Sequence, residues 1–129
     1  MIPKSTAKLA AGDCCFIPCS AGRFVPFVFI CKVGNARSYF IGGLVGQALE
    51  SDDASLLESE STISAYAMLH IQCYARNDTP VAANIADKLA DGEFERIERA
   101  SRDISVGSKH RVWGYRAVFK VAEEIADNL

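Results

Sequence analysis

The chain has 129 residues, of which 50% are hydrophobic and 23% are charged, and this composition is typical of one compact folded domain. Its 14 basic and 16 acidic side chains give a formal charge of -2, which argues against a bulk electrostatic grip on nucleic acid or on an anionic membrane. The high apolar fraction and small net charge also argue against intrinsic disorder. We therefore predict a single domain over residues 1–129 that binds neither nucleic acid directly nor a membrane.

The cysteines indicate the compartment. There are five, an odd number, and the first eight residues contain no apolar segment of signal-peptide length. The predicted location is the reducing cytoplasm, where the thiols serve as small buried hydrophobic groups. The longest apolar run, residues 24–31, contains Pro26 and is far shorter than the roughly 20 residues that a membrane-spanning helix needs.

The first half of the chain has the pattern of a β-meander. Short apolar segments of β-compatible residues, at 14–19, 24–33 and 38–41, are separated by turn sequences. Gly42 and Gly43 are predicted to end the third strand. Strands that follow one another through short turns predict an antiparallel sheet.

The middle of the chain mixes strand and helix patterns. Residues 63–75 alternate between two sets of side chains with a period of two, which favours a strand over a helix. A helix that begins near 77–80 is predicted over 81–89 and ends at Gly92. Residues 93–102 are rich in helix-forming charged residues and predict a second short helix.

The C-terminal part predicts a strand over 112–121 and a short closing helix over 122–129. The predicted fold class is therefore α+β: a curved antiparallel β-sheet with one or two packed helices. The sheet is expected to be a meander that could close part of the way into a barrel.

The charge is least balanced between residues 50 and 60. Five carboxylates lie there with no lysine or arginine among them: Glu50, Asp52, Asp53, Glu58 and Glu60. They alternate with serines, and no histidine or arginine accompanies them to tune an acid/base pair. The segment is predicted to be either a solvated loop or an acidic docking surface for a basic protein partner.

Neither a phosphate-binding loop nor a metal site is predicted, and no cofactor is expected. The glycine-rich segment 42–46 lacks the lysine and the spacing of a phosphate-binding motif, so a tight turn is the favoured interpretation. Cys14, Cys15 and Cys19 have no second cluster of ligands, and on a strand the first two would point to opposite faces.

A cysteine hydrolase is an alternative that the residues leave open. It would pair Cys19 or Cys14 with His110 or His70, because a catalytic thiolate needs a neighbouring base. The cysteines lie in β-like sequence with no helix after them, which disfavours this arrangement.

A short pattern near the N-terminus points further. A Gly-Asp pair, a short apolar stretch, Ile-Pro and a glycine-basic-aromatic turn follow one another; the residues concerned are Gly12, Asp13, Ile17, Pro18, Gly22, Arg23 and Phe24. This pattern resembles the opening of the immunity protein 26 family of bacterial polymorphic-toxin systems. The resemblance covers roughly the first quarter of the chain.

The resemblance implies a non-enzymatic cytoplasmic immunity protein that binds one cognate toxin domain, commonly a nuclease, and blocks its active site. The acidic segment would then imitate the polyanion that a nuclease cleft binds. Aromatic anchors are expected among Tyr39, Phe40, Trp113 and Tyr115, although each residue is equally compatible with the core. A non-catalytic adaptor or ligand-binding domain is the other alternative.

Overall fold

The computed structural model describes residues 9–33, 38–71, 81–102 and 112–128 of the chain. The strands are β1 (Asp13–Pro18), β2 (Phe24–Lys32), β3 (Tyr39–Val45), β4 (Ile63–His70) and β5 (Ala83–Asn84), and the helices are α2 (Glu93–Ala100) and α3 (Tyr115–Asp127). Within these ranges, short 3₁₀ helices lie in the connections: η2 (Ser20–Gly22), η3 (Ala54–Leu56) and η4 (Ala86–Lys88). Neither α2 nor α3, the α-helices of the described ranges, is long and apolar enough to cross a membrane.

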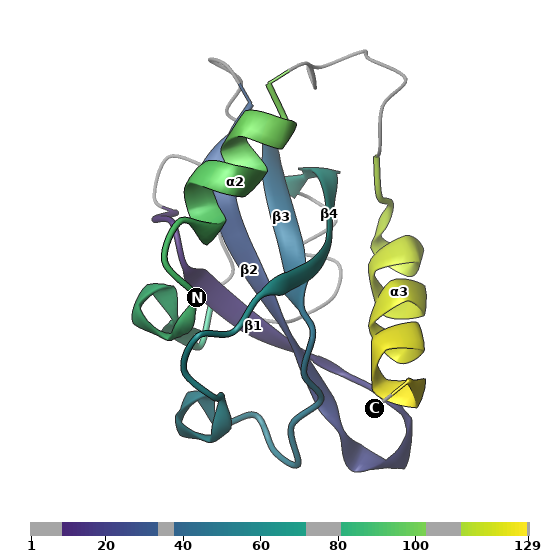
Figure 1. The fold of residues 1–129 in the computed structure, drawn as a ribbon. Helices are drawn as coiled ribbons and strands as arrows, with labels where there is room; N and C mark the ends of the chain where they lie inside the picture. Colours follow the sequence, from purple (N-terminus) through teal and green to yellow (C-terminus); the bar gives the residue numbers. More distant parts are fainter. Residues whose placement is uncertain (1–8, 34–37, 72–80, 103–111, 129) are drawn as a thin grey trace.

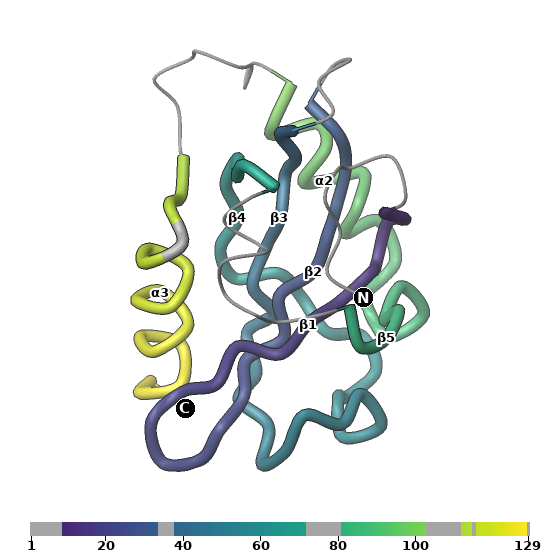
Figure 2. The backbone as a smooth tube through the Cα atoms, turned by 180° about the vertical axis from the view of Figure 1, so that it is seen from behind, coloured from purple at the N-terminus to yellow at the C-terminus, as the bar shows by residue number. Residues whose placement is uncertain are grey.

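The five strands form one antiparallel sheet in the order β4-β3-β2-β1-β5 (Figure 1 and Figure 2). The strands β1 to β4 follow one another across it, so the predicted meander and the α+β fold class are confirmed. The sheet is curved but open, because β4 and β5 are its two edges. In the described part of the chain, the segments beside those edges meet only at one parallel bridge, between Ser61 and Leu89. One bridge does not pair the edge strands, and the sheet therefore does not close into a barrel.

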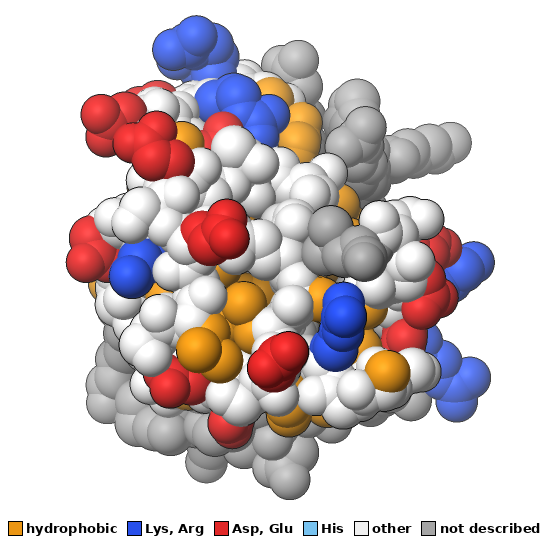
Figure 3. Space-filling model, turned by 60° about the horizontal axis from the view of Figure 1, so that its bottom comes forward, with side chains coloured by type: hydrophobic (Ala, Val, Ile, Leu, Met, Phe, Trp, Pro, Cys, Tyr) orange, Lys and Arg blue, Asp and Glu red, His pale blue; other side chains and the backbone are white. Residues whose placement is uncertain are grey.

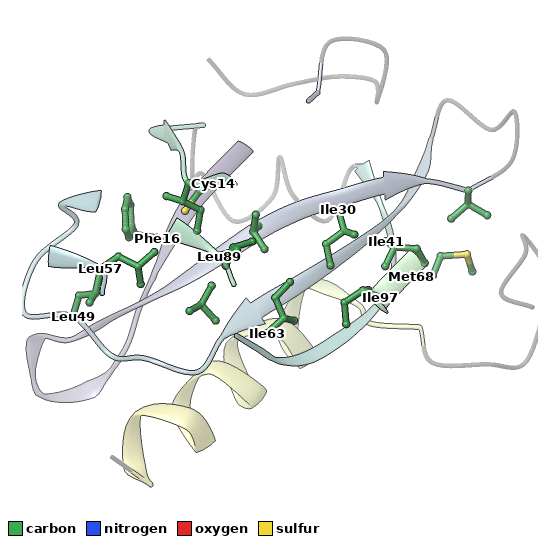
Figure 4. Close-up of a cluster of buried hydrophobic side chains, with 14 residues drawn as sticks. Cys14, Phe16, Ile30, Ile41, Leu49, Leu57, Ile63, Met68, Leu89 and Ile97 are labelled. Atoms are coloured by element: carbon green, nitrogen blue, oxygen red, sulfur yellow. The ribbon is translucent and has the colours of Figure 1, made fainter. Parts of the chain in front are cut away.

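The two helices cover opposite faces of the sheet, and each strand alternates its side chains between two cores. In β1, Cys14 and Phe16 belong to the buried cluster beneath α2, to which Ile97 also belongs (Figure 4). Cys15 and Ile17 belong to the cluster on the other face. Figure 2 shows α3 on this side of the sheet. Because both faces are buried, apolar residues run continuously along the central strands.

The predicted strand over 112–121 is wrong, because α3 begins at Tyr115 and continues to Asp127. Only Val112 forms a bridge, to Met68 of β4. Val118 and Ala122 are buried four residues apart, which is the spacing of one helical face. The β-compatible residues of this segment thus supply the apolar stripe of a helix that packs on the sheet. The closing helix predicted over 122–129 is confirmed as far as Asp127, where it forms the second half of α3.

The predicted helix over 81–89 is also wrong. Backbone groups of this segment bond to β1 and to the residue before it: Ala82 N donates to Cys14 O and Ile85 N donates to Gly12 O, both at 2.9 Å. Ile85 and Leu89 are both buried, and their spacing of four residues imitates a helical pattern. Its predicted start at 77–80 lies outside the described residues.

Gly92 begins a helix instead of ending one. It adopts a φ of +82° as the residue before α2, a left-handed conformation that favours glycine. The helix predicted over 93–102 is confirmed by α2.

The third strand is longer than predicted, because it continues through Gly42 and Gly43 to Val45. These glycines allow close packing: a Cβ atom on Gly42 would lie 2.5 Å from the Phe27 ring. The strand predicted over 63–75 is confirmed as far as His70, and residues 72–75 lie outside the described ranges.

Candidate functional site

The acidic segment lies in the connection between β3 and β4, residues 46–62, which we call the acidic loop. Leu49 and Leu57 turn inward from it and join the buried cluster beneath α2. Leu49 also pairs with the start of β2, because Phe24 N donates to Leu49 O at 2.8 Å and Leu49 N donates to Phe24 O at 2.7 Å. These contacts hold the acidic loop against the sheet at two points.

Asp53 shapes the tip of the acidic loop. Its Oδ1 accepts hydrogen bonds from Ser55 N at 2.9 Å and from Ser55 Oγ at 2.8 Å, which caps the start of η3. These hydrogen bonds, from the backbone first, lower the pKa of the Asp53 carboxyl. Asp53 therefore supports the loop conformation in addition to contributing charge.

A second network joins the two limbs of the acidic loop. Gln47 Nε2 donates to Ser61 Oγ, and Ser61 Oγ donates in turn to Glu58 O. Glu58 N donates back to Gln47 Oε1 at 3.3 Å, so a single glutamine side chain crosses the loop. Ser61 is buried and its N donates to Lys88 O at 3.0 Å, which ties the loop to the segment after β5.

A hollow of about 570 Å³, which we call the acidic hollow, opens between these limbs. Its lining residues are Gly46, Gln47, Ala48, Leu49, Glu50, Leu56 and Glu58. Leu56 is 48% exposed and is one of two large hydrophobic side chains that the described structure exposes. Figure 3, which brings the lower end of Figure 1 forward, shows acidic side chains beside apolar ones on this face. The acidic hollow thus combines two carboxylates with an accessible leucine.

All five predicted carboxylates, Glu50, Asp52, Asp53, Glu58 and Glu60, are exposed on the acidic loop. Glu50 and Glu58 are brought together at the acidic hollow. Glu60 adopts a φ of +62° at the turn that leads into β4, which is uncommon for a residue other than glycine. The structure therefore brings two of the five carboxylates together at the acidic hollow and leaves the other three exposed on the same loop.

The predicted aromatic anchors are not brought to that surface. Tyr39 pairs with His70 at the far end of β3 and β4, whereas the acidic loop leaves from Val45 and returns at Ile63. The rings of Tyr39 and His70 meet in a T-shaped contact with centroids 4.8 Å apart.

Two further predicted anchors, Trp113 and Phe40, also lie away from the acidic loop. Trp113 packs against the cluster beneath α3, and its N donates to Met68 O at 3.0 Å. Phe40 is fully buried, so it is a core residue and not an anchor for a partner. The side chain of Tyr115 lies outside the described structure.

Leu56 and Gln47 are the site residues that the sequence reasoning missed. The available signal was the pair Leu56–Leu57 inside an otherwise polar segment. When two adjacent apolar residues lie in an extended or turning chain, one points inward and the other outward. Leu57 is buried and Leu56 is exposed, in agreement with this geometry.

The thiols of the hydrolase alternative are in unsuitable surroundings. Burial raises the pKa of the Cys14 thiol well above its usual range, and nearby Cys15 and Asp13 raise it further. Burial, followed by the Glu123 carboxylate, also raises the pKa of Cys19. A cysteine nucleophile needs a lowered pKa, so neither thiol is prepared for this chemistry. His110 lies outside the described residues.

Iodoacetamide labelling of the folded protein at pH 7 is expected to be slow at Cys14, Cys19 and Cys31. The thiolate is the reactive form, and burial, reinforced by Glu98, raises the pKa of Cys31 to about 11. Peptide mass spectrometry would give the rate at each cysteine, with the urea-denatured protein as the control. Rapid labelling of Cys14 or Cys19 near neutral pH would contradict this prediction and favour the hydrolase.

Among the described residues, no group of three or more His, Cys, Asp and Glu side chains is placed to hold a metal ion. Comparisons with protein-family models, with curated proteins and with solved structures found no match for this chain. The observations thus define a small α+β domain that presents an acidic hollow on a loop held to its core.

Proposed function

We propose that this chain is a protein inhibitor of the immunity type, which binds a cognate toxin domain and occludes its active site with the acidic loop. The toxin would be a nuclease, because an enzyme that cleaves nucleic acid needs a positive cleft for the phosphate backbone. The observation that carries the proposal is the acidic hollow, where Glu50 and Glu58 stand beside exposed Leu56. A basic cleft provides complementary charge for this surface.

The carboxylates of the acidic loop are available to a partner. The ion pair found within 4.0 Å among the described residues joins Glu93 to Arg96, and it involves none of the five carboxylates on the loop. Their mutual repulsion would fall when a basic surface approaches. Because the loop is held by Asp53, Gln47 and Ser61, it needs little ordering on binding, which favours affinity.

Leu56 supplies the apolar contact of the proposed interface. Charged residues at an interface mainly raise the association rate and exclude wrong partners, whereas buried apolar anchors contribute most of the binding free energy. An exposed leucine bordered by carboxylates fits a partner that places an apolar pocket within a basic rim.

The proposed location is the cytoplasm. Cys14, Cys15, Cys19 and Cys31 are free thiols, as expected of a protein in a reducing compartment. An immunity protein must meet its toxin where the toxin acts, so this location agrees with the inhibition of a nuclease that enters the cell.

Co-expression tests the proposal directly. If the neighbouring upstream gene encodes a large secreted protein, its variable C-terminal domain is the candidate toxin. Expression of that domain should stop growth, and co-expression with this chain should restore growth and give a complex that co-purifies. Failure to rescue growth and to co-purify with that domain would overturn the proposal.

Neutralising the acidic loop is expected to slow association by about 10- to 100-fold at low salt. The variant carries Glu50→Gln, Asp52→Asn, Glu58→Gln and Glu60→Gln, and it retains Asp53 because that side chain caps η3. Stopped-flow or surface-binding kinetics would measure the association rate, and the difference from the unmodified protein should shrink as salt is raised.

A matched control removes four exposed carboxylates elsewhere on the molecule. It carries Asp87→Asn, Asp91→Asn, Glu124→Gln and Asp127→Asn, all at exposed positions, so its net charge equals that of the loop variant. Its association rate should stay within about threefold of the unmodified protein, because local charge steers docking more than net charge does. Equal slowing by both variants would contradict a specific acidic surface.

Leu56→Ala is expected to weaken the complex about tenfold, mainly through faster dissociation. Because Leu56 is 48% exposed, the substitution should change the free energy of unfolding of the protein by less than about 0.5 kcal/mol. Dissociation kinetics and urea unfolding of the same variant separate the two effects. An unchanged dissociation rate would show that the acidic hollow lies outside the interface.

A further inference from the structure

A second cavity, of about 470 Å³, lies between the end of β2 and the last turns of α2. This volume is in the range of sites for small molecules. Cys31, Lys32 and Val33 line it from the sheet, and residues of α2 and the turn after it line the other wall. Lys32 pairs with Phe40, so the cavity is at the end of the sheet away from the acidic loop.

The lining is dominated by charged side chains. Lys32, Arg99 and Arg102 bring three positive charges, and Glu95 and Glu98 bring two negative charges. None of these five side chains is in the ion pair found within 4.0 Å among the described residues. The Cys31 thiol adds no charge near pH 7, because burial raises its pKa to about 11. Guanidinium groups on the wall of a cavity favour an oxyanion, which they can bind in a bidentate manner.

Ser101 provides an independent indication of a ligand. It lines the cavity and is 6% exposed, and its Oγ is a buried atom with no hydrogen-bond partner among the residues that the structure describes. Its backbone N already donates to Ile97 O at 2.9 Å, so the hydroxyl alone is unsatisfied. A buried polar atom of this kind is costly and uncommon in a folded protein. An acceptor bound in the cavity would give the hydroxyl a partner.

We propose that this cavity binds a small oxyanion, held by the side chains of Arg99, Arg102 and Lys32 and by a hydrogen bond donated from Ser101 Oγ. The carboxylates of Glu95 and Glu98 lower the net charge of the lining to +1, so the site suits a small anion and not a highly charged one. The proposal is independent of the proposed function, because the cavity and the acidic loop lie at opposite ends of the sheet.

Titration of the isotopically labelled full chain with inorganic phosphate, and separately with succinate, tests the proposal by NMR at constant ionic strength. We expect saturable amide shifts confined to residues 31–33 and 98–102, with half-saturation at about 1 mM or below for one of the two probes. Preference for phosphate would identify a phosphoryl group, and preference for succinate a carboxylate. Shifts that are spread over the surface, or absent with both probes, would overturn the proposal.

Matched charge variants separate a built site from general attraction to positive charge. Arg99→Gln with Arg102→Gln should weaken binding of the preferred probe by about tenfold or more. Arg116→Gln with Lys120→Gln removes the same charge from exposed positions on α3 and should leave binding within about twofold. Equal losses in both variants would overturn the site.

Ser101→Ala tests the role of the hydroxyl. It should weaken binding of the preferred probe by several-fold without lowering the Tm of the unliganded protein, because the hydroxyl forms no hydrogen bond to the described residues that the change would remove. A clear fall in Tm, with binding unchanged, would show that the hydroxyl is structural and would remove Ser101 from the proposal.

Discussion

Ile97→Ala is expected to lower the free energy of unfolding by about 2–5 kcal/mol, the usual cost of removing a fully buried isoleucine side chain beyond Cβ. Ile97 is 0% exposed and lies in the cluster that joins α2 to the sheet, together with Ile30 and Ile41 (Figure 4). The change leaves a cavity between two layers that are both held by regular structure, so collapse around it is limited. Urea unfolding followed by circular dichroism measures the loss.

Leu56→Ala is the matched control for this prediction, because it also removes a large aliphatic side chain but from an exposed position. It should cost less than about 0.5 kcal/mol. If Ile97→Ala fails to fold, Ile97→Val keeps the test measurable, with an expected cost of about 0.5–1.5 kcal/mol. Equal effects of Ile97→Ala and Leu56→Ala would contradict the position of α2 on the sheet.

The meander was predictable because the sequence features that specify it lie close together along the chain. Apolar segments in β1 and β2 are bounded by turn residues, and neighbouring strands then pair through short connections. Local patterns failed for the segments at 81–89 and 112–121. Ile85 and Leu89 are buried on a segment that bonds to β1 and to Ser61, and those distant partners, which the sequence does not reveal, decide between a helix and an extended chain.

The strand predicted over 112–121, where the structure has the C-terminal helix α3, was wrong for a different reason. The first residues of α3, Tyr115 to Val121, include aromatic and β-branched side chains that favour strands. The sheet, however, needs a cover for its second face, and the stripe of Val118 and Ala122 supplies it. Tertiary burial overrode local propensity, as it does when an amphipathic face finds a partner.

The site was predictable only in its charges. Five carboxylates in eleven consecutive residues, 50–60, are visible in the sequence, and a loop keeps such residues exposed. Either Leu56 or Leu57 could have been the exposed apolar residue of the site. The path of the folded chain decides which of the two points outward, and the sequence does not reveal that path. Tyr39 and Trp113 were assigned to the site by residue type alone. Tyr39 begins β3 at the end opposite to the acidic loop, and Trp113 lies before α3 and packs against the cluster beneath that helix.

Glu93 is a buried charged residue, and its removal should lower the free energy of unfolding strongly. Its Oε2 accepts from Ile63 N at 2.7 Å, at the first residue of edge strand β4. Arg96 donates to the same carboxylate, through Nε to Oε1 at 2.6 Å and Nη2 to Oε2 at 3.0 Å, and Nη2 also donates to Ile63 O at 3.2 Å. The Glu93–Arg96 pair thus satisfies both backbone groups of Ile63 and connects α2 to the sheet edge.

Glu93→Ala is expected to cost about 2–4 kcal/mol of unfolding free energy, because it leaves the buried Ile63 N–H without its acceptor. Glu93→Gln retains an acceptor oxygen and should cost about half as much. Glu95→Gln, at an exposed position in the same turn, is the matched control and should change stability by less than about 0.5 kcal/mol. Urea unfolding at pH 7 measures all three.

The pH dependence of these variants distinguishes a charge effect from a packing effect. Hydrogen bonds from Arg96, followed by the one from Ile63, lower the pKa of Glu93 in the folded protein, so the ionised form stabilises the fold. This contribution is complete above the pKa of an unfolded glutamate, about 4.3, and is lost as pH falls through the lowered folded value. The stability difference between the unmodified protein and Glu93→Gln should therefore shrink as pH is lowered below about 4. A difference that stays constant from pH 7 to pH 3 would show that shape, and not charge, accounts for the contribution of Glu93.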